Sequence, residues 1–479
     1  MRIFGPVKGG LVSIRYLCRL SIAFGAALLL ATAGFAQGVR GTITGQVKDS
    51  SGAVIPGATV KLINVATRQV ARTAQANADG VYELVEVEPA TYNVDIAAPG
   101  FSEVVLQNAV VEPNRHLTLD ATMKAAGATE EVTVSAGQQL LDRDSATLGT
   151  TVDNKRVEDL PLDGREILNL ALLQPGVSPV SDNNGGSVDA GNGFRVNGAR
   201  GNQNNFTLEG ANNNEEAVGS DLGNEPRPDA VQEFRLLTGN YEAEFGRNVG
   251  SVVNVVIKGG TDKYHGDARI FYRPTFLSSA QFFDNLNGLP KRRFERKEFG
   301  GNFGGPLPIP FLDKGKQKTF FFFDYEGRRQ LLGNTNQLTE VPTQAMVGGD
   351  FSALLQPNNE FSASPIQLVN PFTGKPFPNN IIPSGMISPI AKFYYSFLPP
   401  APASGRVGAQ ANQITNNNYI TARLDHTISD KQQAGFIANY FSQNQTAPFA
   451  FGGANTPGFG EVDARNTYNF IFEHTYTIT

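Results

Sequence analysis

The chain has 479 residues, enough for several domains, and a formal net charge of −5. This acidic balance argues against a nucleic-acid partner, because phosphate binding needs a basic surface. Beyond the first few dozen residues no apolar run approaches the ~20 residues of a membrane helix, so any role in a membrane has to use strands.

The first 36 residues predict a cleaved signal peptide. The apolar stretch Leu20–Ala33 follows four positive side chains, Arg2, Lys8, Arg15 and Arg19. Gly34-Phe35-Ala36 then supplies the small-x-small pattern of a cleavage site. The alternative is a membrane anchor, for which the apolar stretch is short. Cleavage after Ala36 leaves 443 residues (479 − 36), removes the single cysteine, Cys18, and makes the formal charge −9 (−5 − 4).

Short alternating segments separated by turns fill residues 41–125. The predicted strands include Gly41–Asp49, Thr59–Asn64, Val81–Leu84, Pro89–Ile96 and about Arg115–Met123. About seven short strands at this spacing indicate a β-sandwich.

The same segment resembles the carboxypeptidase regulatory-like domain, a prealbumin-like β-sandwich. The residues that match are Gly45, Val47, Gly52, Pro56, Gly57, Ala58, Val60, Asp79, Gly80, Tyr82, Pro89, Tyr92, Val94, Pro99, Gly100 and Phe101. The resemblance implies a carbohydrate-binding-like fold, so the segment either contacts a glycan or serves as a structural spacer.

No constellation for catalysis, a metal or a cofactor stands out in the sequence. None of the four histidines, His116, His265, His426 and His474, has a glutamate three residues later. The Gly-x-Ser-x-Gly elbow and the phosphate-binding glycine loop are also missing. We therefore expect neither an enzyme nor a bound cofactor.

Residues 129–260 predict a small α+β domain. A short helix is expected over Arg165–Leu173, before Pro175-Gly176, and a second helix is expected to start at Pro228. The apolar run Ser251–Lys258 predicts a strand that stops at Gly259-Gly260.

This domain resembles the plug of TonB-dependent outer-membrane receptors. The motif residues are Arg195, Gly198, Arg200, Leu208, Gly210, Phe245, Gly246, Arg247, Gly250 and Asn254, with Phe245 in place of a tyrosine. Asn197 and Glu209 depart mildly from the motif. The resemblance makes Arg195, Arg200 and Arg247 candidates for pairing with acids on the barrel wall; the alternative is that they are ordinary solvated arginines, since exposed pairs contribute only ~0–1 kcal/mol.

The segment between the two domains resembles a TonB box. Its candidate residues are Glu131, Val132, Thr133, Val134 and Ser135. Alternating valine and threonine can pair with an incoming strand by edge addition. The resemblance implies a TonB-type energy-coupling protein as partner, and the alternative is simply the first strand of the plug.

From residue 265 to 479 the sequence predicts strands of an antiparallel outer-membrane β-barrel, in contact with lipid. Segments of ~10 residues with alternating apolar and polar positions are typical of such barrels. They are Asp267–Arg273, Thr319–Arg328, Tyr419–Ile428, Gln433–Ser442 and Thr467–Thr477. The interval 331–413 predicts a long extracellular loop with a short helix near Ile387–Phe397. Phe299–Leu307 and Asn418–His426 resemble the Oar-like branch of the family.

About six strands can be placed, whereas the family closes a 22-stranded barrel. Only 219 residues (479 − 260) follow Gly260. The sequence therefore predicts either the N-terminal part of a longer protein or the product of a truncated reading frame, with an incomplete barrel.

The sequence as a whole predicts a mostly β receptor of the outer membrane. It would bind a ligand at the cell surface and import it by displacement of the plug. The resemblance allows a saccharide, a peptide, a siderophore or an exported protein as ligand. The alternative is a surface adhesion or carbohydrate-binding structural protein that transports nothing.

Overall fold

The computed structural model describes residues 40–126, 147–180, 193–214, 225–241, 245–246, 248–280, 282–286, 291–313, 317–359, 361–397, 405–429, 431–447 and 461–477. The predicted signal peptide, the TonB-box candidate Glu131–Ser135 and Arg247 lie outside these residues. Within them, no helix combines the length and apolar character that crossing a bilayer requires.

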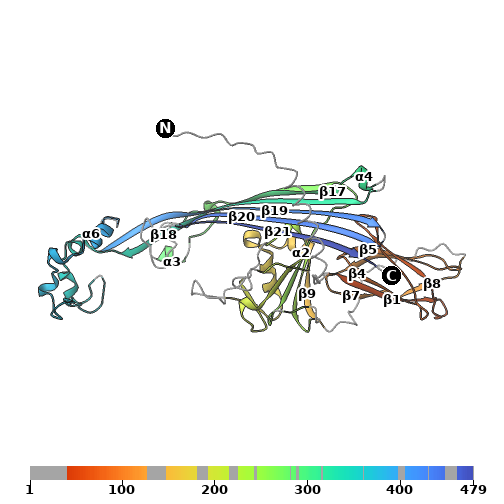
Figure 1. Ribbon diagram of the computed structural model, residues 1–479, viewed down its shortest axis with the longest axis horizontal. Helices are drawn as coiled ribbons and strands as arrows, with labels where there is room; N and C mark the ends of the chain where they lie inside the picture. The colour runs from red at the N-terminus through yellow and green to blue at the C-terminus, as the bar shows by residue number, and fades with distance from the viewer. Residues whose placement is uncertain are drawn as a thin grey trace, which may run out of the picture.

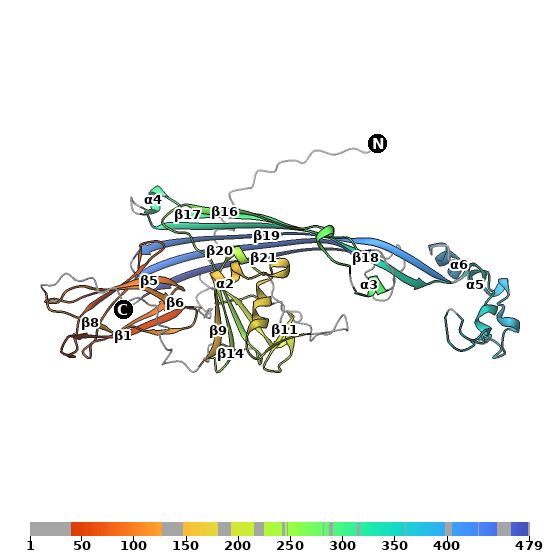
Figure 2. The same cartoon turned by 180° about the vertical axis from the view of Figure 1, so that it is seen from behind.

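Three bodies make up the described structure (Figures 1 and 2). We call them the N-terminal unit (residues 40–126), the central unit (residues 147–260) and the long sheet (strands β16–β21). The N-terminal and central units lie on the same side of the long sheet. The hairpin β18–β19 runs past them and ends in a loop region at the far end of the molecule.

The N-terminal unit consists of two four-stranded sheets that share one hydrophobic core. Its strands are β1 (Gly41–Asp49), β2 (Thr59–Asn64), β3 (Val70–Gln75), β4 (Val81–Val87), β5 (Ala90–Ala97), β6 (Val104–Val111), β7 (His116–Thr118) and β8 (Ala121–Met123). In β1 every second residue is buried, as a strand with one covered face requires.

The single strand expected over Arg115–Met123 is wrong, because it is split into β7 and β8. Both pair in parallel with β1, at different ends. Between them, the Leu119 carbonyl accepts a hydrogen bond from the Tyr82 hydroxyl at 2.7 Å, and the Asp120 carboxylate accepts one from the Gln46 amide at 2.9 Å. The Leu119 amide also donates to the Thr44 carbonyl of β1 at 2.7 Å, so these side-chain contacts supplement a single backbone bond between the two short strands.

The central unit is built on a five-stranded sheet in the order β13-β12-β15-β14-β9. Its strands are β9 (Leu148–Asp153), β10 (Val177–Pro179), β11 (Phe194–Val196), β12 (Asn205–Leu208), β13 (Ala211–Asn212), β14 (Val231–Gly239) and β15 (Val252–Ile257). Its helical turns are α2 (Asn154–Asp159), η2 (Asp163–Arg165), η3 (Ile167–Leu173), η4 (Gly201–Gln203) and η5 (Pro228–Ala230). Every residue of β15 is buried, as its continuous apolar run predicts.

Two helix predictions in this unit need correction. The helix expected to begin at Pro228 is a single 3₁₀ turn, and β14 follows it at once. Val231, Phe234 and Leu236 pair with β15 instead, so burial in the sheet overrides the local start signal. The helix expected over Arg165–Leu173 is 3₁₀ rather than α and begins at Ile167.

The long sheet is antiparallel, with its strands in chain order. They are β16 (His265–Arg273), β17 (Phe294–Pro306), β18 (Thr319–Glu340), β19 (Arg406–Ser429), β20 (Gln432–Ala447) and β21 (Glu461–Tyr476). The described strands form an open sheet with β16 and β21 at its edges. β17 was not predicted as a strand, because its glycines interrupt the alternation.

The connections of the long sheet carry short helices. They are η6 (Thr275–Leu277), α3 (Phe282–Leu286), α4 (Pro310–Asp313), α5 (Gln344–Val347), η7 (Ser352–Leu355), η8 (Pro378–Asn380), η9 (Ser384–Met386) and α6 (Pro389–Tyr395). The short helix predicted near Ile387–Phe397 is confirmed as α6. The predicted loop 331–413 is too long, because β18 and β19 extend to Glu340 and back from Arg406.

The two faces of the long sheet have different surroundings. Apolar side chains on one face are exposed, among them Ile270, Phe323, Phe436, Phe470 and Phe472. On the other face Phe322, Ile437 and Ile471 join the hydrophobic core of the central unit. Phe322 breaks the apolar–polar alternation of β18 because its side of the sheet packs against protein.

We predict that Phe234→Ala destabilises the central unit by about 3–5 kcal/mol, the usual cost of removing a buried aromatic ring. Phe234 is fully buried between β9 and β15. Hydrogen exchange of the β15 amides measures the effect, with the exposed Val249→Ala as control. Equal exchange in the two variants would contradict the assignment of this core.

Candidate functional site

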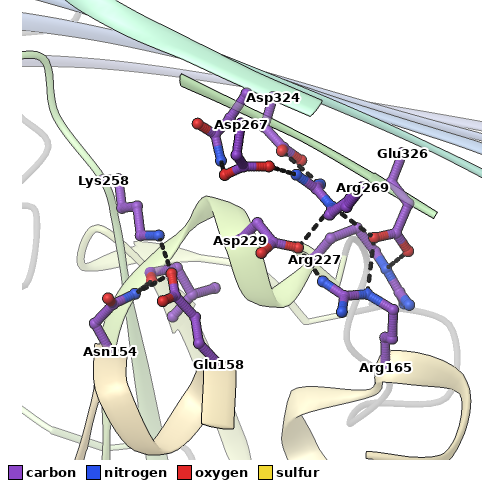
Figure 3. A network of polar contacts seen from close by, with 12 residues as sticks. Asn154, Glu158, Arg165, Arg227, Asp229, Lys258, Asp267, Arg269, Asp324 and Glu326 are labelled. Carbon is purple, nitrogen blue, oxygen red and sulfur yellow. Dashed lines mark hydrogen bonds and ion pairs between the residues drawn. The ribbon is translucent and has the colours of Figure 1, made fainter. Parts of the chain in front are cut away.

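A network of charged side chains joins the central unit to the long sheet (Figure 3). The central unit contributes Arg165, Arg227 and Asp229, and the long sheet contributes Arg269, Asp324 and Glu326. Three guanidinium groups therefore meet these three carboxylates, and Arg269 also pairs with the exposed Asp267 of its own strand at 3.2 Å. The central unit supplies the excess positive charge and the long sheet the excess negative charge.

Glu326 on β18 accepts hydrogen bonds from two arginines of the central unit. Its Oε1 accepts from Nε of Arg227 at 2.6 Å, and its Oε2 accepts from Nε of Arg165 at 3.0 Å. The side chains of Arg227 and Glu326 are each 1 % exposed. Arg227 also donates to the Gly164 carbonyl at 2.6 Å and lies over the Tyr419 ring. Removing one partner of such a buried pair leaves an uncompensated charge.

Arg269 on β16 is the counterpart from the long sheet. Its Nη2 lies 2.6 Å from Asp324 Oδ1, and its Nε lies 2.7 Å from Asp229 Oδ2. Asp229 also pairs with Arg165. The carboxylate of the central unit thus sits between two guanidinium groups, one from each body (Figure 3).

Local sequence places these groups. Pro228 occupies the first position of the η5 turn, where its fixed φ is compatible with a helical start, and so presents Asp229 at the end of the sheet. The period of two in β18 puts Asp324 and Glu326 on one face. Gly300 pairs with both Arg269 and Glu326, and a Cβ there would collide with the Tyr325 carbonyl.

Burial and neighbouring charges shift the pKa values of Arg227 and Asp229 in the central unit. Burial alone would lower the pKa of Arg227, but Glu326 outweighs it and the pKa is raised above its ordinary value. Burial raises the pKa of Asp229, against the opposing effect of Arg165 and Arg269. Arg227 therefore stays charged at any physiological pH. Its positive charge is balanced only while the Glu326 carboxylate remains beside it.

A second contact between the same bodies lies around Arg423 on β19. Its Nη1 donates to Glu209 Oε1 at 2.8 Å and to the Ile257 carbonyl at 3.1 Å. Glu209 also accepts a hydrogen bond from the Ile257 amide at 2.6 Å. The last strand of the central unit, β15, is thereby tied to β19.

In the described structure, two arginines that the sequence did not single out join the central unit to the long sheet. Arg165 and Arg227 of the central unit reach Glu326. Arg195 lies half-buried on β11, Arg200 caps η4, and Arg247 lies outside the described residues. The signal that could have found the site is the pair Asp324 and Glu326, acids at alternate positions of an otherwise aromatic strand.

The remaining motif residues have structural positions inside the central unit. Leu208 and Phe245 are buried. Gly198 and Gly210 have positive φ, and a Cβ at Gly250 would lie 2.9 Å from the Gln203 carbonyl oxygen. A Cβ at Gly246 would meet no atom within 4 Å.

Asn254 is a further motif residue, buried on β15. It contacts Thr207 on β12 and donates to Asn114 of the N-terminal unit at 2.7 Å. Among the described residues, no group of three or more His, Cys, Asp or Glu side chains is placed to hold a metal ion.

Comparisons with known proteins match both ends of the described chain. Residues 42–124 match the model of the carboxypeptidase regulatory-like domain, and residues 256–479 match that of the outer membrane beta barrel domain. The TonB-dependent transporter Oar of Myxococcus xanthus is 26 % identical over 319 residues, which cover 64 % of this chain and 28 % of that protein. The chain thus spans about a quarter of the length of this curated relative.

Among solved structures, the outer membrane transporter YddB from Escherichia coli has a TM-score of 0.42 and 13 % identity, over 69 % of this chain and 37 % of that one. A mutant of the ferric enterobactin receptor PfeA from Pseudomonas aeruginosa, in complex with enterobactin, has a TM-score of 0.33 and 13 % identity, over 62 % and 33 %.

We predict that Glu326→Gln loosens the central unit on the long sheet by about 3 kcal/mol, because Arg165 and Arg227 lose their shared carboxylate. Hydrogen exchange of η5 and β14 reports the change. The matched control is Glu295→Gln on β17, whose pair with Lys297 is exposed and screened by water, so its loss should change the exchange little. Equal effects of the two variants would contradict the role given to Glu326.

A pH dependence is expected from Glu225, beside Arg227. Burial raises its pKa from 4.5 to about 7, although Arg227 opposes the shift. The folded state then holds a proton that the unfolded chain releases, so stability falls as pH rises from about 4.5 to about 7. Glu225→Gln should match the wild type at pH ~4 and exceed it in stability at pH ~8. Parallel denaturation curves at both pH values measure this, and a constant difference would contradict it.

Proposed function

Since the chain belongs to the TonB-dependent transporter family and carries an outer membrane β-barrel domain, we propose that it binds a ligand at the cell surface and imports it by displacement of the central unit. The central unit acts as the plug and the long sheet as part of the barrel wall. No chemical step on the ligand is involved.

The observation that carries the proposal is the charged contact between the central unit and the long sheet. Arg227, Asp324 and Glu326 are buried and the other three groups are half-buried, and opposite charges face each other, so they hold the closed state in one defined position. A buried ion pair gains little over water, because its desolvation cost offsets its attraction. Admitting water between the two bodies therefore costs less than separating an apolar interface of the same extent.

We assign the parts of the chain as the sequence indicates. Residues 1–36 are a signal peptide, 41–125 the carboxypeptidase regulatory-like domain, 129–260 the plug and 265–479 barrel strands. Glu131–Ser135 is the TonB box, where a TonB-type energy-coupling protein adds a strand and pulls on the plug. The ligand is a saccharide, a peptide, a siderophore or an exported protein.

We predict that replacing Val132 and Val134 by proline weakens binding of the periplasmic domain of the energy-coupling protein at least about tenfold. Proline removes the backbone donors that strand addition needs. Replacement of both by threonine keeps those donors and the β propensity, so it should leave binding unchanged. Titration of the purified chain in detergent measures both.

Unchanged binding by the proline variant would contradict energy coupling through this segment. It would favour a surface protein that binds a glycan and moves nothing.

A further inference from the structure

The N-terminal unit has a separate hydrophobic core. Its core cluster contains residues from Ile43 to Met123 alone, whereas the core of the central unit includes Phe322, Ile437 and Ile471 of the long sheet. Central unit and long sheet therefore share apolar packing, and the N-terminal unit folds around residues of its own.

The N-terminal unit nevertheless contacts both other bodies through polar groups. Arg72 on β3 is only 3 % exposed, and its Nη1 donates to Gln433 on β20 at 3.2 Å. Arg40 pairs with Glu473 on β21 at 3.3 Å. Arg72 also donates to the Ala71 and Glu86 carbonyls of its own unit, at 2.7 Å each. On undocking, water can replace Gln433 and Glu473, so these polar contacts can open without leaving a charge buried and unpaired.

A second contact lies on the sheet of the central unit. The turn between β6 and β7 offers the Pro113 carbonyl to Arg235 and the Asn114 side chain to Asn254, and Glu112 accepts from Thr151 at 3.1 Å. Arg235 and Asn254 are buried there. These residues lie on three neighbouring strands, β9, β14 and β15.

A third contact holds the connection between the central unit and the long sheet. The Asp262 amide donates to the Ala66 carbonyl at 2.9 Å, and the Asp262 carboxylate lies 3.0 Å from Arg68 Nε. The turn between β2 and β3 thus binds the segment that connects β15 to β16.

A cavity of about 410 Å³ lies where the three bodies meet, lined by residues of all of them, including Glu88, Glu209 and Glu473. Polar contacts with residual space are typical of interfaces that open and close, whereas permanent ones are more apolar and closely packed.

We propose that the N-terminal unit is a releasable clamp. Docked, it ties β9, β14 and β15 of the central unit to β20 and β21 of the long sheet and restrains the connection at Asp262. Its release frees the central unit to move. The docking stands on the contacts above, and only the link between release and import rests on the proposed function.

Docking is tested by cross-linking in outer membranes. Without its signal peptide the chain has no cysteine, so introduced thiols react alone. Asn114→Cys with Asn254→Cys should join in high yield through a short thiol cross-linker. The control pair, Ser51→Cys with Asn254→Cys, uses an exposed turn residue whose described side-chain hydrogen bond goes to Asp49, and it should join at least tenfold less. Equal yields overturn the docking.

Release is tested by charge reversal. Arg72→Glu in the first pair should lower the cross-linking yield at least fivefold and speed hydrogen exchange of β14 and β15. Lys61→Glu, the same charge change at an exposed position of the same unit, should alter neither. Trypsin resistance of the N-terminal unit verifies that this unit remains folded. If Arg72→Glu abolishes the resistance, Gln433→Ala on β20 is used instead of Arg72→Glu. Undocking without faster exchange overturns the clamp. Neither readout needs a ligand or import.

Discussion

The arrangement of the central unit against the long sheet depends on Glu326, a carboxylate buried on the face of β18 that the central unit covers. Two guanidinium groups of the central unit converge on it, and neither can release its charge. Such a group can be exposed to water or neutralised, but it cannot be left alone in a protein interior. Any placement of the central unit that excludes water from the interface must therefore preserve the ion pairs of Arg165 and Arg227 with Glu326. That requirement defines one closed position.

The long sheet meets this requirement because its faces differ. Alternation along a strand sends aromatic side chains outward, where a sheet of an outer membrane barrel meets lipid, and charged side chains inward. Where the inner face meets the hydrophobic core of the central unit instead, Phe322, Ile437 and Ile471 replace polar residues. The same face thus combines apolar packing, which holds the central unit, with buried charge, which fixes its position.

Much of the strand content could be predicted from periodicity, and less of the site. The predicted strands Thr59–Asn64 and Ser251–Lys258 correspond to β2 and β15, because a covered face or a fully buried strand leaves a clear pattern. The strand β17 was missed because its glycines interrupt the alternation of apolar and polar side chains. One of them, Gly300, pairs with Arg269 on the neighbouring strand. Pro228 misled for a related reason: a start signal of one turn cannot show that the next residues pair with β15. Arg165 and Arg227 carry no local signal, since their partner lies 161 and 99 residues away.

Movement of the central unit against the long sheet is the central claim, and thiol labelling of Ile437→Cys tests it most directly. Ile437 on β20 is fully buried in the hydrophobic core that the long sheet shares with the central unit, and a chain cleaved after Ala36, as we propose, has no other thiol. In cells with a working energy-coupling protein and a proton-motive force, the account predicts that a membrane-impermeant maleimide labels this cysteine. Collapse of the proton-motive force should abolish the labelling. Labelling that is equally absent, or equally fast, in both states would contradict displacement of the central unit.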